Sequence, residues 1–188
     1  MIEFRKNSED KPYIILRDLY KKALDCNQMN IEAIVISSYN KNDNEVNSRF
    51  VNLKYVENDK WVFFTNYNSP KSRDFNSHSQ ISAIFHWNMI NIQIRVKANI
   101  KKLPSNESDA HFMNRDPKKN ALAVASNQSS KVESHEYIKD KYLKVLNSQN
   151  EYKRPDYWGG YTFTPYYFEF WEGHPARLNK RDSYELID

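Results

Sequence analysis

The stretch INIQIRVKANIKKL, residues 90–103, alternates apolar and polar side chains. Apolar residues occupy every second position from Ile90 to Ile100, and polar or charged residues lie between them. Because successive side chains of a β-strand point to opposite faces of a sheet, this period of two predicts a long strand. One face of the strand would be buried, and the other would carry Gln93, Arg95 and Lys97.

Apolar segments on both sides of this stretch predict further strands. Residues 31–39 and 81–87 are rich in β-branched and other apolar side chains, which favours strand formation. Residues 49–56 and 60–66 flank the polar sequence ENDK. Two apolar runs joined by such a short polar segment predict a hairpin.

The aromatic stretch at residues 154–171 predicts one more strand, in which Pro165 indicates a bulge or an edge position. Six or more strands, joined mostly by short turns and with helices inserted between them, predict a mainly β fold. We expect an antiparallel barrel with peripheral helices. No internal repeat or long linker divides the sequence, so we expect a single domain over residues 1–188, with residues 1–11 flexible.

Helical signals occur between the predicted strands. Apolar spacing after a proline indicates a helix, and a serine before a helical segment is a favourable N-cap. The expected helices cover residues 12–26, a segment that begins at Ser69 and Pro70, residues 105–114 capped by Ser105, and residues 135–147 capped by Ser134.

The composition excludes several classes of binding site. The only glycines are Gly159, Gly160 and Gly173, so neither a phosphate-binding P-loop nor a dinucleotide-binding fingerprint can be present. The five histidines show no metal-ligand spacing and Cys26 is the single cysteine, so we expect no metal site and no disulfide framework. A phosphate would therefore have to be bound by side chains.

The charge balance is mildly basic, with 28 Lys and Arg against 24 Asp and Glu. This excess favours an anionic partner and does not require nucleic acid. The N-terminal residues lack an apolar leader, and no apolar run reaches the length of a membrane span. We therefore expect a cytoplasmic protein with no membrane partner.

Cationic and hydroxyl side chains recur near the ends of the predicted strands. A flavin mononucleotide (FMN) site would use such a set, because cations and hydroxyls bind a phosphate and an aromatic plane suits a flavin ring. The groups are Arg49 and Lys54, then Thr65, Ser69, Lys71 and Arg73, then Arg115, then Gln128, Ser129 and Ser130, and finally Arg177 and Arg181.

Each of these residues also has an ordinary interpretation. Arg and Lys on a half-exposed strand usually face solvent, and a Trp such as Trp171 is more often part of a core. Counting by twos also places Arg49 and Lys54 on opposite strand faces. A site shared by both would need a bulge or the end of the strand.

The stretch EFWEGHPARLNKR, residues 169–181, adds an aromatic plane and two guanidinium groups near the C-terminus. In order along the chain it follows RFVNLK, VFFTNYNSPK, QIRVKANIKKL, ASNQSS and RPDYWGGY. Together these motifs resemble the pyridoxine/pyridoxamine 5'-phosphate oxidases, from about residue 12 to residue 184. The resemblance implies an FMN-binding split β-barrel that forms a homodimer with FMN at the subunit interface.

Carried over residue by residue, the resemblance implies which side chains contact FMN, some of them from the other subunit. The implied contacts are Arg49, Phe50, Val51, Asn52, Leu53 and Lys54, then Phe64, Thr65, Lys71 and Gln93, and finally Gln128, Ser129, Trp171 and Arg181.

The resemblance also implies a site for a phosphorylated small-molecule substrate. The family's Lys, Tyr, Arg and Ser around the substrate phosphate correspond here to Lys54, His111, Arg115 and Lys119. The family's RLH element reads RLN, so the implied catalytic and substrate-contacting residues are Arg177 and Asn179. Pro70 stands where an Arg is usual on the FMN side.

The implied reaction is the oxidation of pyridoxine or pyridoxamine 5'-phosphate to pyridoxal 5'-phosphate, with hydride transfer from substrate C4' to flavin N5 and O2 as acceptor. Two alternatives stay open. One is a related FMN-dependent oxidase with a different substrate, as in phenazine biosynthesis, and the other is a flavin-binding protein without turnover. A nucleic-acid-binding barrel is disfavoured because 24 acidic residues offset the positive charge, so no nucleic-acid partner is expected.

Overall fold

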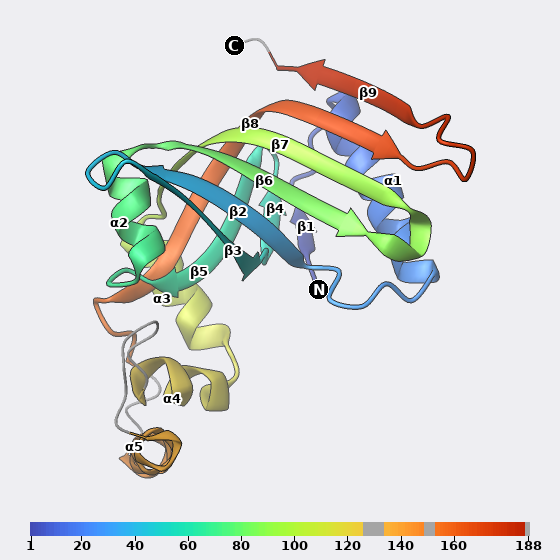
Figure 1. The fold of residues 1–188 in the computed structure, drawn as a ribbon. Coiled ribbons are helices and arrows are strands. Elements are labelled where there is room, and N and C mark those ends of the chain that lie inside the picture. Colours follow the sequence, from blue (N-terminus) through green and yellow to red (C-terminus); the bar gives the residue numbers. More distant parts are fainter. Residues whose placement is uncertain (126–133, 149–152, 187–188) are drawn as a thin grey trace.

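The computed structural model describes residues 1–125, 134–148 and 153–186. Within these residues, nine strands form one strongly curved sheet (Figure 1). The strands are β1 (Glu3–Arg5), β2 (Ala33–Asn40), β3 (Glu45–Asn52), β4 (Tyr55–Glu57), β5 (Lys60–Asn66), β6 (Gln80–Trp87), β7 (Ile92–Lys102), β8 (Trp158–Glu172) and β9 (Lys180–Glu185).

The strand order is β1-β4-β5-β8-β7-β6-β2-β3, and β9 pairs with β8 beyond the end of β5. All of these pairs are antiparallel except β1 with β4, which run parallel. The curvature brings β3 back into contact with β5, although the two strands are not paired in the sheet. The predicted mainly antiparallel barrel is thereby confirmed.

The strand predicted by the period-two stretch is β7, at the centre of the sheet. Ile92, Ile94 and Val96 are buried, whereas the polar residues between them are at least partly exposed. Burial of an aliphatic side chain of this size stabilises a fold by about 1.5–3 kcal/mol, so this face anchors the sheet. The strand begins two residues later than predicted, because Asn91 adopts a left-handed conformation (φ 52°) after a short 3₁₀ turn.

Helices lie around the sheet and do not interrupt it (Figure 1). The α1 helix packs its buried Tyr13 and Leu16 onto the core, and α3, α4 and α5 extend from the opposite end of the barrel. The helices are α1 (Lys11–Asp25), α2 (Pro70–Ser77), the 3₁₀ turn η1 (Asn88–Ile90), α3 (Ser105–Asn114), α4 (Pro117–Ala125) and α5 (His135–Ser148). No described helix is both long and apolar enough to cross a membrane.

The N-terminal segment contains a short strand that joins the sheet. Glu3–Arg5 pairs with β4, Ile2 is buried, and its backbone N–H donates a 2.9 Å hydrogen bond to the Tyr20 hydroxyl. The segment predicted to be flexible, residues 1–11, therefore includes a short paired strand, and its apolar Ile2 and Phe4 pack against the core cluster.

Several predicted boundaries also change. The predicted strand 49–56 is two strands, because Leu53 and Lys54 lie between β3 and β4. The α4 helix and β9 were not predicted, and the N-cap of α3 is Pro104, so that Ser105 is the first helical residue. The bulge suggested by Pro165 is present, since the β7–β8 register shifts between its partner Ala98 and the preceding Lys97.

Candidate active site

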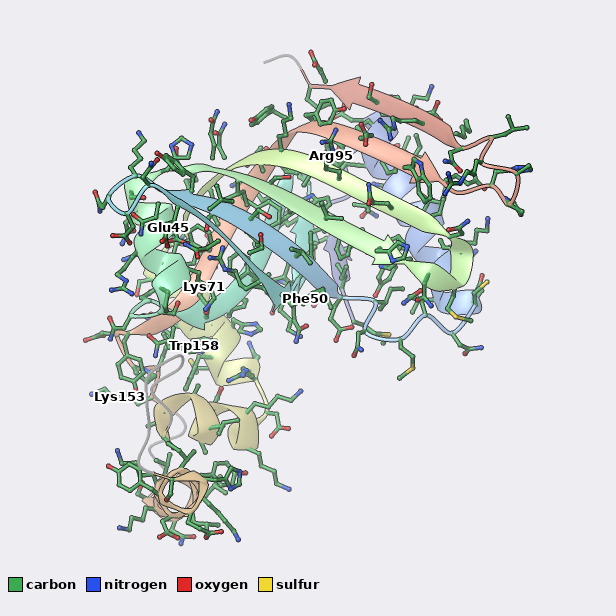
Figure 2. The ribbon with its side chains drawn as sticks, viewed as in Figure 1. Glu45, Phe50, Lys71, Arg95, Lys153 and Trp158 are labelled. Carbon is green, nitrogen blue, oxygen red and sulfur yellow. The ribbon has the colours of Figure 1, made fainter. Side chains whose placement is uncertain are left out.

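A cavity of about 590 Å³ opens where the ends of β3 and β5 meet α2, α3 and α4. Figure 2 places the labelled Phe50, Lys71 and Trp158 around this region, on β3, α2 and β8. The cavity is lined by Phe50, Val51, Asn52, Lys54, Phe64, Thr65, Asn66, Lys71, His111, Arg115, Asp116, Lys119, Leu122, Ala123 and Trp158.

The break between β3 and β4 explains how Lys54 reaches the cavity. The Leu53 side chain is fully buried in the core, and its backbone N–H donates to the Glu32 carbonyl oxygen at 2.9 Å. The next N–H, of Lys54, donates to the Val62 carbonyl oxygen at 2.8 Å. The chain therefore ends one strand and starts another at this point. Lys54 is thereby released from the strict alternation that would have separated it from the other cavity residues.

One cationic group of the cavity lies at the start of α2. Lys71 Nζ donates to Thr65 Oγ1 at 3.2 Å and to Ser69 Oγ at 3.1 Å. Burial lowers the pKa of Lys71, and the nearby Arg49 charge lowers it further, while Asp74 acts in the opposite direction. A buried ammonium surrounded by hydroxyls is a favourable partner for a phosphate.

Arg49 does not line the cavity. Its Nη2 forms a 2.8 Å ion pair with Asp74 Oδ2, and its Nη1 donates to Ser38 Oγ at 2.6 Å. The guanidinium is therefore held between β2 and α2, outside the cavity but close enough to Lys71 for its charge to lower the pKa of that lysine. In this position it contributes positive potential to the Lys71 end of the cavity.

A second cationic group comes from the β3–β4 connection and from the α3–α4 region. Burial lowers the pKa of Lys54, and the charges of Lys119 and Arg115 lower it further against the opposing effect of Glu32. Burial also lowers the pKa of Arg115, whose Nη1 donates to the Lys119 carbonyl oxygen at 2.8 Å. Among the described residues these three cations form no salt bridge, which leaves them available to an anion.

Aromatic rings form the wall next to this second group. The rings of His111 and Phe64 stack at 3.6 Å between centroids and 7° between planes, and Trp158 lies nearly parallel to both. Burial lowers the pKa of His111 to about 4, and the charges of Arg115 and Lys54 contribute to the shift. His111 is therefore a neutral hydrogen-bonding group at pH 7.

The predicted C-terminal site residues lie elsewhere in the chain. Gln93 pairs with Trp171, and Trp171 with Arg181, at the end of β8 that lies away from Trp158 (Figure 1). Arg181 Nε lies 3.9 Å from Glu169 Oε1. None of these residues lines the cavity of their own chain.

The remaining predicted residues are distributed as follows. Arg177 is exposed, with a positive φ of 62° in the turn before β9. The Asn179 side chain closes that turn, because its Oδ1 accepts a 3.0 Å hydrogen bond from the His174 N–H. Gln128 and Ser129 lie outside the described residues.

Several cavity residues were not predicted as site residues. Asp116, Leu122 and Ala123 belong to α4 or precede it, and that helix was missed, so no pattern pointed to them. Asn66 and Trp158 stand within the quoted motifs VFFTNYNSPK and RPDYWGGY, which could have identified them.

The family model described as pyridoxamine 5'-phosphate oxidase matches residues 21–148. A second model, the pyridoxine 5'-phosphate oxidase C-terminal dimerisation region, matches residues 158–188. The chain belongs to the pyridoxamine 5'-phosphate oxidase family. The cavity residues from Phe50 to Ala123 fall within the first match, and Trp158, Trp171 and Arg181 fall within the second.

Curated relatives in this family cover most of the chain. The pyridoxine/pyridoxamine 5'-phosphate oxidase 1 of Hydrogenovibrio crunogenus is 32% identical over 97% of this chain and 85% of its own length. The chloroplastic enzyme of Arabidopsis thaliana is 31% identical over 96% of this chain, and the pyridoxine-5'-phosphate oxidase of Bos taurus is 34% identical over 86%. The chain spans only 34% of the Arabidopsis protein and 63% of the bovine one.

Two solved structures of other proteins show the same fold. PhzG from Burkholderia lata 383, solved with tetrahydrophenazine-1-carboxylic acid, superposes with a TM-score of 0.87 at 23% identity, covering 94% of this chain and 87% of PhzG. A pyridoxamine 5'-phosphate oxidase-related, FMN-binding protein from Nostoc punctiforme gives a TM-score of 0.65 at 9% identity, covering 92% and 97%. At these identities the likeness establishes the fold alone.

Proposed function

We propose that this protein is an FMN-dependent oxidase of pyridoxine or pyridoxamine 5'-phosphate. The observation that carries the proposal is the presence of two separate cationic groups in one cavity with aromatic walls. Lys71 interacts electrostatically with Arg49 and Asp74, whereas Lys54 interacts with Lys119 and Arg115. Two separate cationic groups suit two phosphate monoesters, one on the cofactor and one on the substrate.

The Lys71 end fits the phosphate of FMN. Its ammonium is buried, is hydrogen-bonded to two hydroxyls, and has no salt bridge among the described residues. Lys71 lies in the first turn of α2, where the helix dipole also favours an anion. FMN, when bound, supplies two-electron redox chemistry with O2 as the final acceptor.

The other end would hold the substrate phosphate. Lys54, Arg115 and Lys119 would bind the anion there, and His111 would add a neutral donor. Binding a phosphate that does not react converts remote binding energy into orientation of the reacting carbon. The stacked rings of Phe64 and Trp158 would exclude water from that side of the cavity.

The C-terminal residues would reach this cavity from a second subunit. Within one chain, Trp171, Arg177 and Arg181 lie at or beyond the opposite end of β8 from the cavity. The match to a C-terminal dimerisation region supports a homodimer in which each subunit completes the partner's site. Arg177 and Asn179 would then face the reacting end of the substrate, and Gln93 and Trp171 the flavin.

An anaerobic titration tests the proposal. FMN-loaded protein is mixed with pyridoxine or pyridoxamine 5'-phosphate, and the visible flavin absorbance is followed before and after air is admitted. Bleaching that recovers in air supports the oxidase. A flavin that binds and stays oxidised supports a related oxidase with another substrate, or a flavin-binding protein without turnover.

A matched pair of variants makes the titration specific. Lys54→Met removes a cation of the substrate end, and Lys60→Met removes an exposed lysine at the far end of β5. The first is expected to weaken bleaching by phosphorylated substrate, while the second leaves it unchanged. If phosphorylated substrate bleaches the flavin equally in both variants, the substrate phosphate does not bind beside Lys54.

A further inference from the structure

Tyr55, on β4, is hydrogen-bonded to the histidine of the proposed substrate end. Its hydroxyl contacts His111 Nδ1. Tyr55 lines a second cavity of about 450 Å³ and does not line the first, whereas His111 lines both. The Tyr55 hydroxyl therefore acts on a ligand in the first cavity through His111, while the Tyr55 ring also contacts Phe64, which lines both cavities.

Burial and nearby charges determine the charge state of the His111 ring. Burial and the positive charges of Arg115, Lys54 and Arg5 keep the ring neutral, with Glu3 as the opposing charge. A neutral imidazole has one N–H and one acceptor nitrogen. A phenolic hydroxyl that donates to Nδ1 leaves the proton on Nε2, at the opposite edge of the ring from Tyr55.

Both partners of this hydrogen bond are held in place by packing. The His111 ring stacks on Phe64 at 3.6 Å, and the Tyr55 ring meets the same Phe64 edge-on. On its other side, the Arg5 guanidinium carbon lies 3.6 Å from the Tyr55 ring centroid, and Arg5 is fixed by hydrogen bonds of 2.7 and 2.8 Å to Glu3. The parallel pairing of β1 with β4, in which Glu3 is the partner of Tyr55, sets this arrangement.

We propose that Tyr55 is a positioning residue that holds His111 in its Nε2–H form, so that the ring donates a hydrogen bond to the phosphate of the bound substrate. This inference rests on the proposed function, since it assigns the phosphate to the end that carries Lys54 and Arg115. A neutral donor adds direction to phosphate recognition without adding a further positive charge to three cations already close together. Tyr55 was not among the residues singled out in the sequence.

The first test reads the tautomer of His111 directly. The full-length, FMN-loaded protein is labelled with ¹⁵N-histidine, and the ring nitrogen shifts are recorded at neutral pH. The chain has only five histidines, and His111→Gln identifies the signals of His111. A neutral Nε2–H form is the expected result. A neutral Nδ1–H form, or a charged ring in the free site, would overturn the proposal without the need for a Tyr55 variant.

The second test removes the hydroxyl. Tyr55→Phe keeps the ring that packs on Arg5 and Phe64, and Tyr39→Phe is the matched control, because its hydroxyl donates to Asn44 in the β2–β3 hairpin. In Tyr55→Phe we expect mixed His111 tautomers and about tenfold weaker binding of pyridoxine 5'-phosphate. Binding of unphosphorylated pyridoxine should be unchanged, and Tyr39→Phe should match the wild type throughout.

The outcomes separate this inference from the proposed function. Inorganic phosphate, tested as a second probe, should also bind more weakly to Tyr55→Phe. If pyridoxine 5'-phosphate does not bind the wild type, yet inorganic phosphate binds in a Tyr55-dependent way, the positioning role stands and the substrate assignment falls. If pyridoxine 5'-phosphate is oxidised but Tyr55→Phe changes neither the tautomer nor the affinity, the positioning role falls alone.

Discussion

Trp171 and Arg181 are direct partners in the antiparallel pairing of β8 with β9, at the far end of β8 from the cavity. Lys71, by contrast, lines the cavity itself. If each site takes Lys71 from one subunit and Arg181 from the other, a dimer of one Lys71→Met chain and one Arg181→Ala chain has one intact site and one doubly altered site. We expect such heterodimers, purified with two different tags, to bind about half the FMN of the wild type with normal affinity.

The two homodimeric variants are the controls for this experiment, since both should lack any site of normal affinity. Should the heterodimer also lack one, Lys71 and Arg181 would act within the same chain, and the shared-site arrangement would be excluded.

We expect Lys71 to lower the stability of the flavin-free protein and to strengthen FMN binding. Its ammonium is buried against hydroxyls, without a salt bridge among the described residues. Lys71→Met should stabilise the flavin-free protein by on the order of 1 kcal/mol, because it removes a desolvated charge. It should weaken FMN binding about 10- to 100-fold, through the loss of a charged hydrogen bond to the phosphate.

Thermal melting and flavin fluorescence titration measure the two effects of Lys71→Met, with Lys60→Met as the exposed control. A variant with unchanged FMN affinity would exclude Lys71 from the cofactor site.

His111 should make the stability of the flavin-free protein depend on pH. Its pKa is lowered from 6.5 to about 4 in the folded state. Between these values the unfolded chain binds a proton that the folded chain does not, so the free energy of unfolding should fall as the pH falls from 6.5 to 4. Urea unfolding at several pH values should show a smaller fall for His111→Gln, and a wild-type fall for the exposed His86→Gln. Identical slopes in all three proteins would mean that His111 titrates normally.

Gly160 lies beside Phe64, whose ring forms part of the cavity wall. It pairs with Phe64 across β5 and β8, and an added Cβ would lie 2.7 Å from Leu103 Cδ2 and 3.0 Å from Phe64 Cε1. Gly160→Ala should therefore cost about 1–3 kcal/mol of stability and displace the ring that stacks on His111. Weaker binding of pyridoxine 5'-phosphate should accompany the loss of stability. Thr164→Ala, on the same strand, is the control, and full retention of both properties in Gly160→Ala would refute the expectation.

Asn179 stands where the family's RLH element has a histidine, and replacing it tests what that position does. An amide cannot transfer a proton as an imidazole can, so Asn179→His should raise kcat with pyridoxine 5'-phosphate if that position acts in proton transfer. The His174 N–H now donates a hydrogen bond to Asn179 Oδ1 and would need a new acceptor in this variant. The Nδ1 of the introduced histidine can accept that hydrogen bond. Asn179→Ala serves as the control and should lower kcat. An unchanged or lower kcat in Asn179→His would argue against a proton-transfer role.

The sequence predicted those parts of the fold that local patterns encode. The alternation along β7, the polar turn between β4 and β5, and the bulge at Pro165 all follow from side-chain period or turn chemistry within a few residues. The break at Leu53 was not predicted, because apolar and polar residues continue to alternate across it in the sequence. In the structure the strand nevertheless ends there, and the Leu53 N–H donates to the Glu32 carbonyl oxygen. Likewise, β9 forms from a polar segment whose strand conformation depends on pairing with β8.

The candidate site was predictable to a similar extent. Lys54, Lys71 and Arg115, three of the residues named from the family resemblance, line one cavity. The direction of Arg49 was not predictable, since its ion pair with Asp74 joins residues distant in sequence. The contact between Tyr55 and His111 was missed for the same reason, because it depends on the docking of α3 against the sheet.

β8 has a consequence for how the molecule would exchange its amide hydrogens. This strand pairs with β7 along most of its length, with β5 at its start and with β9 at its end. Its interior amides should therefore exchange only when the whole sheet opens, which makes it the slowest-exchanging strand. In a homodimer each β8 would carry Trp158 into one site and Trp171 into the other. Ligand binding at either site would then slow amide exchange along the whole of β8, because the strand opens as one cooperative unit and contributes to both sites.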